Sequence, residues 1–142
     1  MILLDTNVLS EAMRPQPAEA VLAWLDGQPT GQVWVCSISR AEIALGLALM
    51  PASKRQAALA HAAEAMFAQD FAGRCLPFDE QAALHYAAIV AQRTRAGRPI
   101  STEDAQIAAI ARLHGLTLAT RNVADFEGID GLAVVNPWLA GA

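Results

Sequence analysis

The sequence has few cysteines, few charged residues and no long apolar run. Its 142 residues contain only two cysteines, Cys36 and Cys75, and neither belongs to a CxxC pair or a Cys/His cluster. This excludes the usual zinc-site patterns and favours two free thiols over a disulfide. Charged residues make up 17% of the chain and hydrophobic residues 54%, which argues against disorder.

Targeting signals and an excess of positive charge are also missing. No stretch reaches the roughly 20 apolar residues of a membrane-spanning helix. The apolar start of the chain is only four residues long and no basic segment precedes it, so we expect no signal peptide, no membrane association and a cytoplasmic protein. The net charge of −4 disfavours a non-specific nucleic-acid binder. It is compatible with a nucleic-acid enzyme that uses metal ions to offset its own carboxylates.

The pattern of apolar segments predicts a single α/β domain over residues 1–142. Short, continuously apolar segments are expected strands, and their continuity favours a mostly parallel sheet covered on both faces. These strands are 1–4, 33–36, 74–77, 116–119 and 132–135. The expected helices are 6–13, 17–25, 37–50, 53–72, 79–98 and 101–114. Residues 122–126 are expected to form a loop or a single helical turn.

Acidic residues recur near the ends of the expected strands. Asp5 follows the first strand directly, Glu42 and Asp125 follow two others by a few residues, and Asp104 begins a helix that leads into a strand. Each has a structural explanation when taken alone. Asp5 can cap a helix, and Glu42 and Asp104 each follow a serine by three residues, which is capping-box spacing.

Helix capping does not explain why these acids share one edge of the sheet. The carboxyl ends of parallel strands meet there, so we expect the four carboxylates to converge. Without interleaved lysine or arginine they repel each other unless cations or protons neutralise them. Ligands that are all oxygen atoms suit Mg²⁺ or Mn²⁺.

Neutral polar residues follow the same strands. They are Thr6, Asn7, Thr120 and Asn122. Two interpretations are open for them: turn and cap chemistry, or orientation of carboxylates and water. Two are likewise open for Arg93, Arg95 and Arg98, namely a solvated helix end or contact with phosphates. None of the three histidines has a second ligand at metal-binding spacing, so none is expected to be catalytic.

Four segments in series resemble the motifs of the PIN-domain family. They are Met1–Glu11, Ser37–Ile43, Pro99–Ala109 and Leu118–Phe126, and Val135-Asn136-Pro137-Trp138 resembles a common ending. The likeness is greatest to the VapC-type toxins of bacterial toxin–antitoxin pairs, including the FitB-like branch.

The resemblance implies a metal-dependent endoribonuclease on a three-layer α/β/α fold with four to five strands. Asp5, Glu42 and Asp104 match the firmest acidic positions of the family and are expected to hold Mg²⁺ or Mn²⁺ together with Asp125. Many members have an acid where this chain has Asn122, so Asn122 and Asp125 are both open as the fourth ligand. Thr120 and Asn122 are expected to orient the attacking water.

The resemblance also implies RNA as substrate, a homodimer and a cognate VapB-like antitoxin that covers the groove. Two alternatives carry other functions. One is a PIN fold without activity that acts as a binding module. The other is a phosphatase of the haloacid-dehalogenase type, which needs a second acid where this chain has Asn7.

Overall fold

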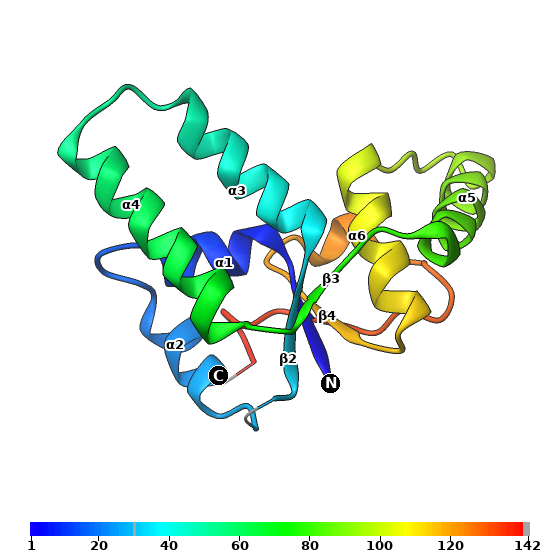
Figure 1. Cartoon of the computed structure of the whole chain (residues 1–142). Coiled ribbons are helices and arrows are strands. Elements are labelled where there is room, and N and C mark those ends of the chain that lie inside the picture. The colour runs from blue at the N-terminus through cyan, green and yellow to red at the C-terminus, as the bar shows by residue number, and fades with distance from the viewer. Residues whose placement is uncertain (30, 141–142) are drawn as a thin grey trace.

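The sheet has five strands in the order β3-β2-β1-β4-β5, and every neighbouring pair is parallel (Figure 1). The computed structural model describes residues 1–29 and 31–140, so residues 30, 141 and 142 of the expected single domain lie outside it. The strands are β1 (Ile2–Leu4), β2 (Val33–Cys36), β3 (Cys75–Leu76), β4 (Thr117–Ala119) and β5 (Val134–Val135). The expected three-layer α/β fold is confirmed, and the described sheet is wholly rather than mostly parallel.

Helices cover both faces of the sheet, four on one side and two on the other (Figure 1). The first face carries α1 (Thr6–Ala12), α2 (Glu19–Asp26), α3 (Ser37–Leu49) and α4 (Lys54–Ala65). The second carries α5 (Glu80–Arg95) and α6 (Thr102–Leu113). A π-helical turn, η1 (Met66–Asp70), extends α4, and a 3₁₀ turn, η2 (Val123–Phe126), follows β4. Within the described residues no helix is long and apolar enough to cross a membrane.

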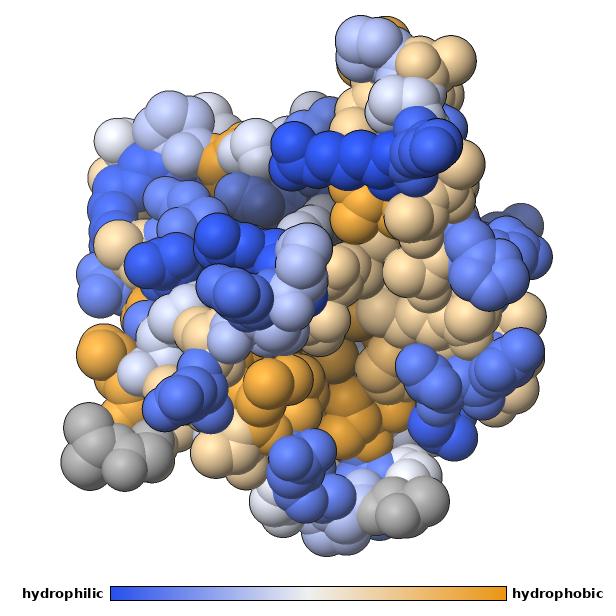
Figure 2. Space-filling view, turned by 90° about the vertical axis from the view of Figure 1, so that its left-hand side faces the viewer, coloured by the Kyte–Doolittle hydropathy of each residue, from blue (hydrophilic) through white to orange (hydrophobic). Residues whose placement is uncertain are grey.

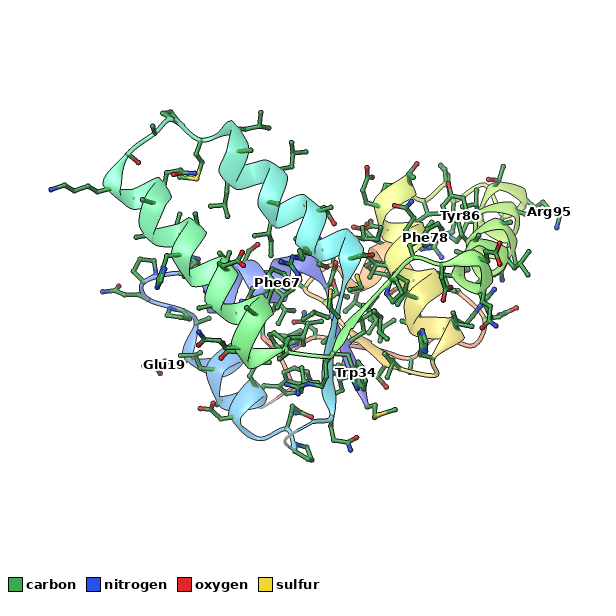
Figure 3. All side chains as sticks on the ribbon, viewed as in Figure 1. Glu19, Trp34, Phe67, Phe78, Tyr86 and Arg95 are labelled. Carbon is green, nitrogen blue, oxygen red and sulfur yellow. The ribbon has the colours of Figure 1, made fainter. Side chains whose placement is uncertain are left out.

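The core consists of one apolar cluster on each face of the sheet. Leu3, Ile107 and Leu118 belong to the cluster under α5 and α6, whereas Leu4 and Val35 belong to the cluster under α1 to α4. Successive strand residues therefore point to opposite faces, as strand geometry requires. Figure 3 shows Phe78 and Tyr86 together on the α5 side, where their rings meet edge to face at 5.9 Å, and Phe67 on the α4 side.

The two cysteines point to opposite faces of the sheet, because Val35 pairs with Cys75 while Cys36 pairs with Leu76. Both thiols are free, as expected. Burial is the largest influence on each and raises the pKa of both thiols.

Two serines, Ser39 and Ser101, were expected to cap helices, and only Ser101 does so. The Ser101 hydroxyl accepts the Asp104 backbone N–H at 3.2 Å, so the expected cap of α6 is confirmed. The expected capping box of Ser39 and Glu42 is wrong. The helix α3 begins at Ser37, directly after β2, and this places Ser39 inside the helix. Ser39 and Glu42 are therefore available for contacts with another element.

The order of the strands creates a crevice between β1 and β4. The chain builds outward from β1 to β2 and β3, then returns to the other side of β1 with β4 and β5. Ligands bind at such a reversal of strand order, outside the carboxyl ends of the strands. Leu4 pairs with Ala119, so the next residues, Asp5 and Thr120, lie side by side at this point.

Candidate active site

Asp5 lies at the floor of the crevice and is only 5% exposed. Its Oδ1 accepts the backbone N–H of Thr6 at 2.8 Å, and its Oδ2 accepts the Thr120 hydroxyl at 2.7 Å. Capping of α1 therefore uses one carboxylate oxygen, and the second is held from β4. The Asn7 amide lies 3.4 Å from the same Oδ2 and also donates to the Thr120 hydroxyl at 3.2 Å.

Thr120 is fully buried and its hydroxyl is saturated with hydrogen bonds. It donates to Asp5 and accepts from the Asn7 amide and from the Asn122 backbone N–H, the last at 3.1 Å. A hydroxyl has one proton and two lone pairs, so no capacity remains for a water molecule. In this structure Thr120 fixes the orientation of the Asp5 carboxylate.

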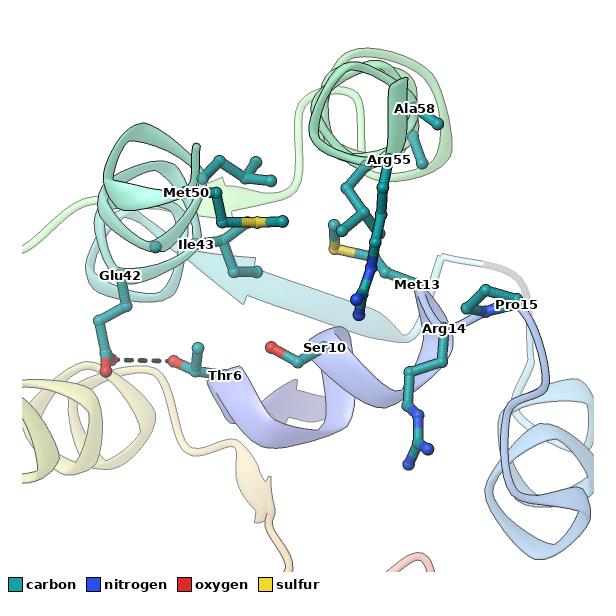
Figure 4. Close-up of a pocket in the computed structure, with 14 residues that line it drawn as sticks. Thr6, Ser10, Met13, Arg14, Pro15, Glu42, Ile43, Met50, Arg55 and Ala58 are labelled. Carbon is teal, nitrogen blue, oxygen red and sulfur yellow. Dashed lines mark hydrogen bonds between the residues drawn. The ribbon is translucent and has the colours of Figure 1, made fainter. Parts of the chain in front are cut away.

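Glu42 is joined to the crevice through Thr6. The Thr6 hydroxyl lies 2.9 Å from Glu42 Oε1 (Figure 4). It also lies 2.9 Å from Ser39 Oγ. Because an ionised carboxylate only accepts, the single Thr6 proton goes to Glu42 and the Ser39 hydroxyl supplies the proton of the other contact. Ser39 is fully buried and holds Thr6 in place from α3.

Asp104 completes a pocket of about 490 Å³ at the carboxyl edge of the sheet. Its lining residues are Asp5, Thr6, Asn7, Ser10, Glu11, Arg14, Glu42, Asp104, Arg121, Asn122 and Trp138. Three of the four acids that the sequence marks, Asp5, Glu42 and Asp104, therefore share this pocket. Asp125 does not line it. Asp125 shares a smaller cavity of about 220 Å³ with Asp104.

The structure thus separates the two candidates for the fourth ligand. Asn122 lines the pocket that holds Asp5, Glu42 and Asp104, whereas Asp125 approaches Asp104 from η2. Asp125 is still close enough for its charge to raise the pKa of both Asp5 and Asp104.

Burial and mutual repulsion act together on the acids. Burial is the largest cause of the raised pKa of Asp5, and the charges of Glu42 and Asp125 raise it further, against the hydrogen bonds from Thr120 and Thr6. Burial also leads for Asp104, followed by the charge of Asp5. A cation in the pocket would oppose both effects by favouring the charged carboxylates.

The donor set fits a hard divalent cation. The side chains around the pocket offer carboxylate, hydroxyl and amide oxygens and no thiol or imidazole. Across the described residues no three Asp, Glu, His or Cys side chains come close enough to surround one ion. Mg²⁺ needs no such cage, since one or two carboxylates and several waters suffice. Asp5 and Asp104 fit that role.

Arg93 is buried, in contrast to a solvated helix end. Its guanidinium donates to the carbonyl oxygens of Arg98 at 2.7 Å, Asp125 at 2.9 Å and Glu127 at 3.3 Å. It therefore ties the end of α5 to the turn that carries Asp125. The sequence alone placed Arg93 in an arginine cluster and could not reveal these bonds. Two of the three carbonyl partners lie more than thirty positions away along the chain.

Two further residues of the pocket were not predicted to be site residues. Arg121 and Trp138 both line it, and the Arg121 guanidinium lies 4.9 Å from the centre of the Trp138 ring. The available signals were the position of Arg121 directly after Thr120 and of Trp138 directly after Pro137.

The sequence profile of the PIN domain matches residues 2–132. The chain belongs to the PIN-domain family. It is 46% identical to Toxin FitB of Neisseria gonorrhoeae over 138 residues, covering 97% of this chain and 99% of the relative. It is 44% identical to VapC ribonuclease Y4jK of Sinorhizobium fredii over 138 residues, covering 97% and 98%.

A solved structure shows the same architecture. The structure of FitAB bound to a DNA fragment contains a chain that is 46% identical and superposes with a TM-score of 0.90, over 97% of this chain and 96% of that one. The resemblance to the FitB-like branch is therefore confirmed over nearly the whole chain.

Proposed function

We propose that this PIN-domain protein is a metal-dependent endoribonuclease and the toxin of a toxin–antitoxin pair. The observation that carries the proposal is the pocket shared by Asp5, Glu42 and Asp104 at the reversal of strand order. The names of two relatives, a toxin and a ribonuclease, support the same function.

In this proposal Asp5 and Asp104 hold Mg²⁺ or Mn²⁺, and Glu42 contributes directly or through water. Bound there, the ion supplies a water of lowered pKa and offsets the charge of the scissile phosphate. The protein holds the Asp5 carboxylate in one orientation through Thr120 and the Glu42 carboxylate through Thr6 and Ser39. Asn122 presents a neutral side chain to the same pocket, where it can orient the attacking water.

Purified protein incubated with RNA tests this proposal. We expect cleavage with Mg²⁺ or Mn²⁺, loss of cleavage with a chelator and recovery when the ion is returned. Asp5→Asn should lose at least about 100-fold in rate, since electrostatic stabilisation by the ion is worth several kcal/mol. Glu64→Gln, which removes an exposed acid of α4 outside the pocket, is the matched control. Cleavage that survives the chelator or Asp5→Asn would sink the proposal.

The remaining alternative is an inactive PIN module that binds a partner without cleaving RNA. Asn122 stands where many relatives are expected to have an acid, and this observation keeps the alternative open. A Mn²⁺ titration monitored by thermal unfolding separates the two. The active enzyme is expected to gain stability with Mn²⁺ in a manner that depends on Asp104, and the inactive module is not.

We infer a VapB-like antitoxin as partner. An apolar groove of about 630 Å³ lies between α1, α3 and α4 (Figure 4). It adjoins the acidic pocket, because Thr6 and Glu42 line both. Figure 2 shows this side of the molecule and its broad apolar surface. An amphipathic helix fits such a groove. Co-purification with, and neutralisation by, the product of a neighbouring small gene is expected, and failure of both would count against the pairing.

We also propose a homodimer. Two exposed leucines support it: Leu45 and Leu49 lie one turn apart on α3 and are 60% and 76% exposed. Adjacent exposed apolar side chains of this size are typical of interfaces. Light scattering should give twice the chain mass for the wild type, and Leu49→Glu should lower it if α3 lies in the interface.

A further inference from the structure

Arg121 occupies the mouth of the acidic pocket. It is the second residue after β4, its side chain is exposed, and it lines the pocket together with Asp5 and Asp104. Its backbone N–H donates to Asn7 Oδ1 at 3.2 Å, so the main chain of Arg121 is fixed to the residue that supports Asp5. The side chain therefore starts from a rigid point at the edge of the sheet.

Trp138 fixes the other end of the Arg121 side chain. The guanidinium lies 4.9 Å from the ring centre, within the range of a cation–π interaction. Trp138 is itself held, because its ring packs against the core cluster under α1 to α4 and its backbone N–H donates to Asn136 Oδ1 at 2.9 Å. The ring face attracts the charge and leaves the N–H donors of the guanidinium available.

The charge of Arg121 is not neutralised within the described part of the chain. The ion pairs there are Arg14 with Glu11 and Arg98 with Glu127. Arg14 is the other arginine of the pocket, and its guanidinium is 3.3 Å from the Glu11 carboxylate. Arg121 shares a pocket with three acids of the site without pairing with any of them, so its placement leaves it open to an external anion.

From this geometry we infer that Arg121, held on Trp138, binds a backbone phosphate of the RNA strand that enters the acidic pocket. The inference rests on the proposed function and names a substrate-binding residue for it. A planar guanidinium with its donors available matches a phosphate group. A cation at the mouth also offsets the repulsion between RNA and the acids, which an acidic protein needs in order to bind RNA.

Binding of a dye-labelled single-stranded oligoribonucleotide tests the inference separately from cleavage. The measurement uses the full chain with Ca²⁺ in place of Mg²⁺, a gel to check that the RNA stays intact, and several salt concentrations. We expect Arg121→Gln to weaken binding about tenfold on uridine and adenosine oligomers alike and to reduce the log–log salt slope by about 0.7, the value for one phosphate contact with a single strand.

Matched variants separate this contact from general effects. Arg95→Gln removes the same charge from an exposed arginine at the end of α5 that points away from the sheet (Figure 3), and it should leave affinity and slope nearly unchanged. Trp138→Leu should reproduce most of the loss, Trp138→Tyr should restore much of it, and Arg121→Gln should add little in a Trp138→Leu background.

The binding and cleavage results together distinguish the phosphate contact from the nuclease proposal. An Arg121→Gln protein that binds like Arg95→Gln overturns the inference, and so does a wild type that binds no RNA or an effect confined to one base. Wild-type protein that cleaves RNA with Arg121→Gln unaffected would contradict this inference alone. Wild-type protein that binds RNA through Arg121 and never cleaves it would contradict the nuclease proposal and leave the phosphate contact standing.

Discussion

The hydroxyl of Thr120 donates a hydrogen bond to Oδ2 of Asp5 across 2.7 Å and thereby joins the ends of β4 and β1. The two residues are 115 positions apart in the chain, and both are buried. The bond favours the charged form of Asp5 and so opposes the larger effect of burial on its pKa. The carboxylate that we propose as a metal ligand is thus held by a residue whose hydroxyl has no hydrogen-bonding capacity left for substrate.

Replacement of Thr120 tests this holding role. Thr120→Val keeps the shape and removes the hydroxyl, which leaves the Asn122 N–H without its acceptor and leaves Asp5 Oδ2 with only the Asn7 amide at 3.4 Å. We expect it to lower the free energy of unfolding by about 1–3 kcal/mol and to weaken Mn²⁺ binding about 10-fold to 100-fold. Urea denaturation and metal titration measure the two effects. Thr120→Ser should retain most of both, and equal behaviour of the two variants would contradict the assigned role.

Arg93 should matter for stability in a way that its helix neighbour does not. Arg93→Met keeps the apolar stem and leaves the carbonyl groups of Arg98, Asp125 and Glu127 without their donor. We expect a loss of at least about 2 kcal/mol in the free energy of unfolding, as for other broken buried networks. Arg95→Met, an exposed change on the same helix, should stay within about 0.5 kcal/mol. Chemical denaturation that finds the two equal would show that the buried bonds contribute nothing.

Asp104 should make stability depend on pH when no metal is present. Its pKa in the folded protein is raised above the ordinary value of 3.8, first by burial and then by the charge of Asp5. The folded state therefore binds the proton more tightly than the unfolded chain, and stability is lost as the pH rises through the folded-state pKa. At neutral pH with a chelator, Asp104→Asn should be more stable than the wild type, by less than about 1 kcal/mol because the group is half-exposed and screened.

Measuring the stability of Asp104→Asn and the wild type at several pH values provides the control for this prediction. The difference between Asp104→Asn and the wild type should shrink as the pH falls through the raised folded-state pKa and disappear below 3.8, where the carboxylate is protonated in both states. Addition of Mn²⁺ at neutral pH should stabilise the wild type and not the variant. Thermal unfolding that shows the wild type more stable under chelation at neutral pH would contradict the repulsion described for this pocket.

Two separate variants distinguish Asn122 from Asp125 as the fourth ligand: one adds a carboxylate at position 122 and the other removes the carboxylate at position 125. Asn122 lines the pocket with Asp5, so Asn122→Asp should tighten Mn²⁺ binding by adding a carboxylate there. Asp125 shares only the smaller cavity with Asp104, so Asp125→Asn should weaken Mn²⁺ binding less than Asp104→Asn does. Calorimetric titration measures both. An Asp125→Asn variant as impaired as Asp104→Asn would place Asp125 among the ligands.

Sequence periodicity was sufficient to predict the parallel sheet and the edge at which Asp5 and Asp104 meet. Both depend on local rules, namely apolar strands and the position of strand ends. The role of Ser39 was not predictable in this way, because the spacing of a capping box looks the same whether the helix begins at Ser37 or later. Its partner Thr6 comes from another element 33 positions away.

Arg121 and Trp138 show the same limit. The residues are 17 positions apart and meet only because β4 and β5 end at the same edge of the sheet. Arg93 likewise carries the local signature of a helix end, and its burial depends on the packing of η2 against α5 and α6. The pattern of apolar and polar residues along the chain did not predict these side-chain contacts, because each joins two different elements.

In the proposed function, RNA cleavage depends on Asp5 and the acids around it. Sequencing of RNA 5′ ends after a short pulse of expression tests this dependence, with wild type, Asp5→Asn and Glu64→Gln compared at equal protein levels. We predict new, discrete RNA ends in cells that express the wild type or Glu64→Gln, and none of these ends with Asp5→Asn. The same ends with Asp5→Asn would show that cleavage does not need Asp5, and no new ends with the wild type would show that the protein does not cleave RNA.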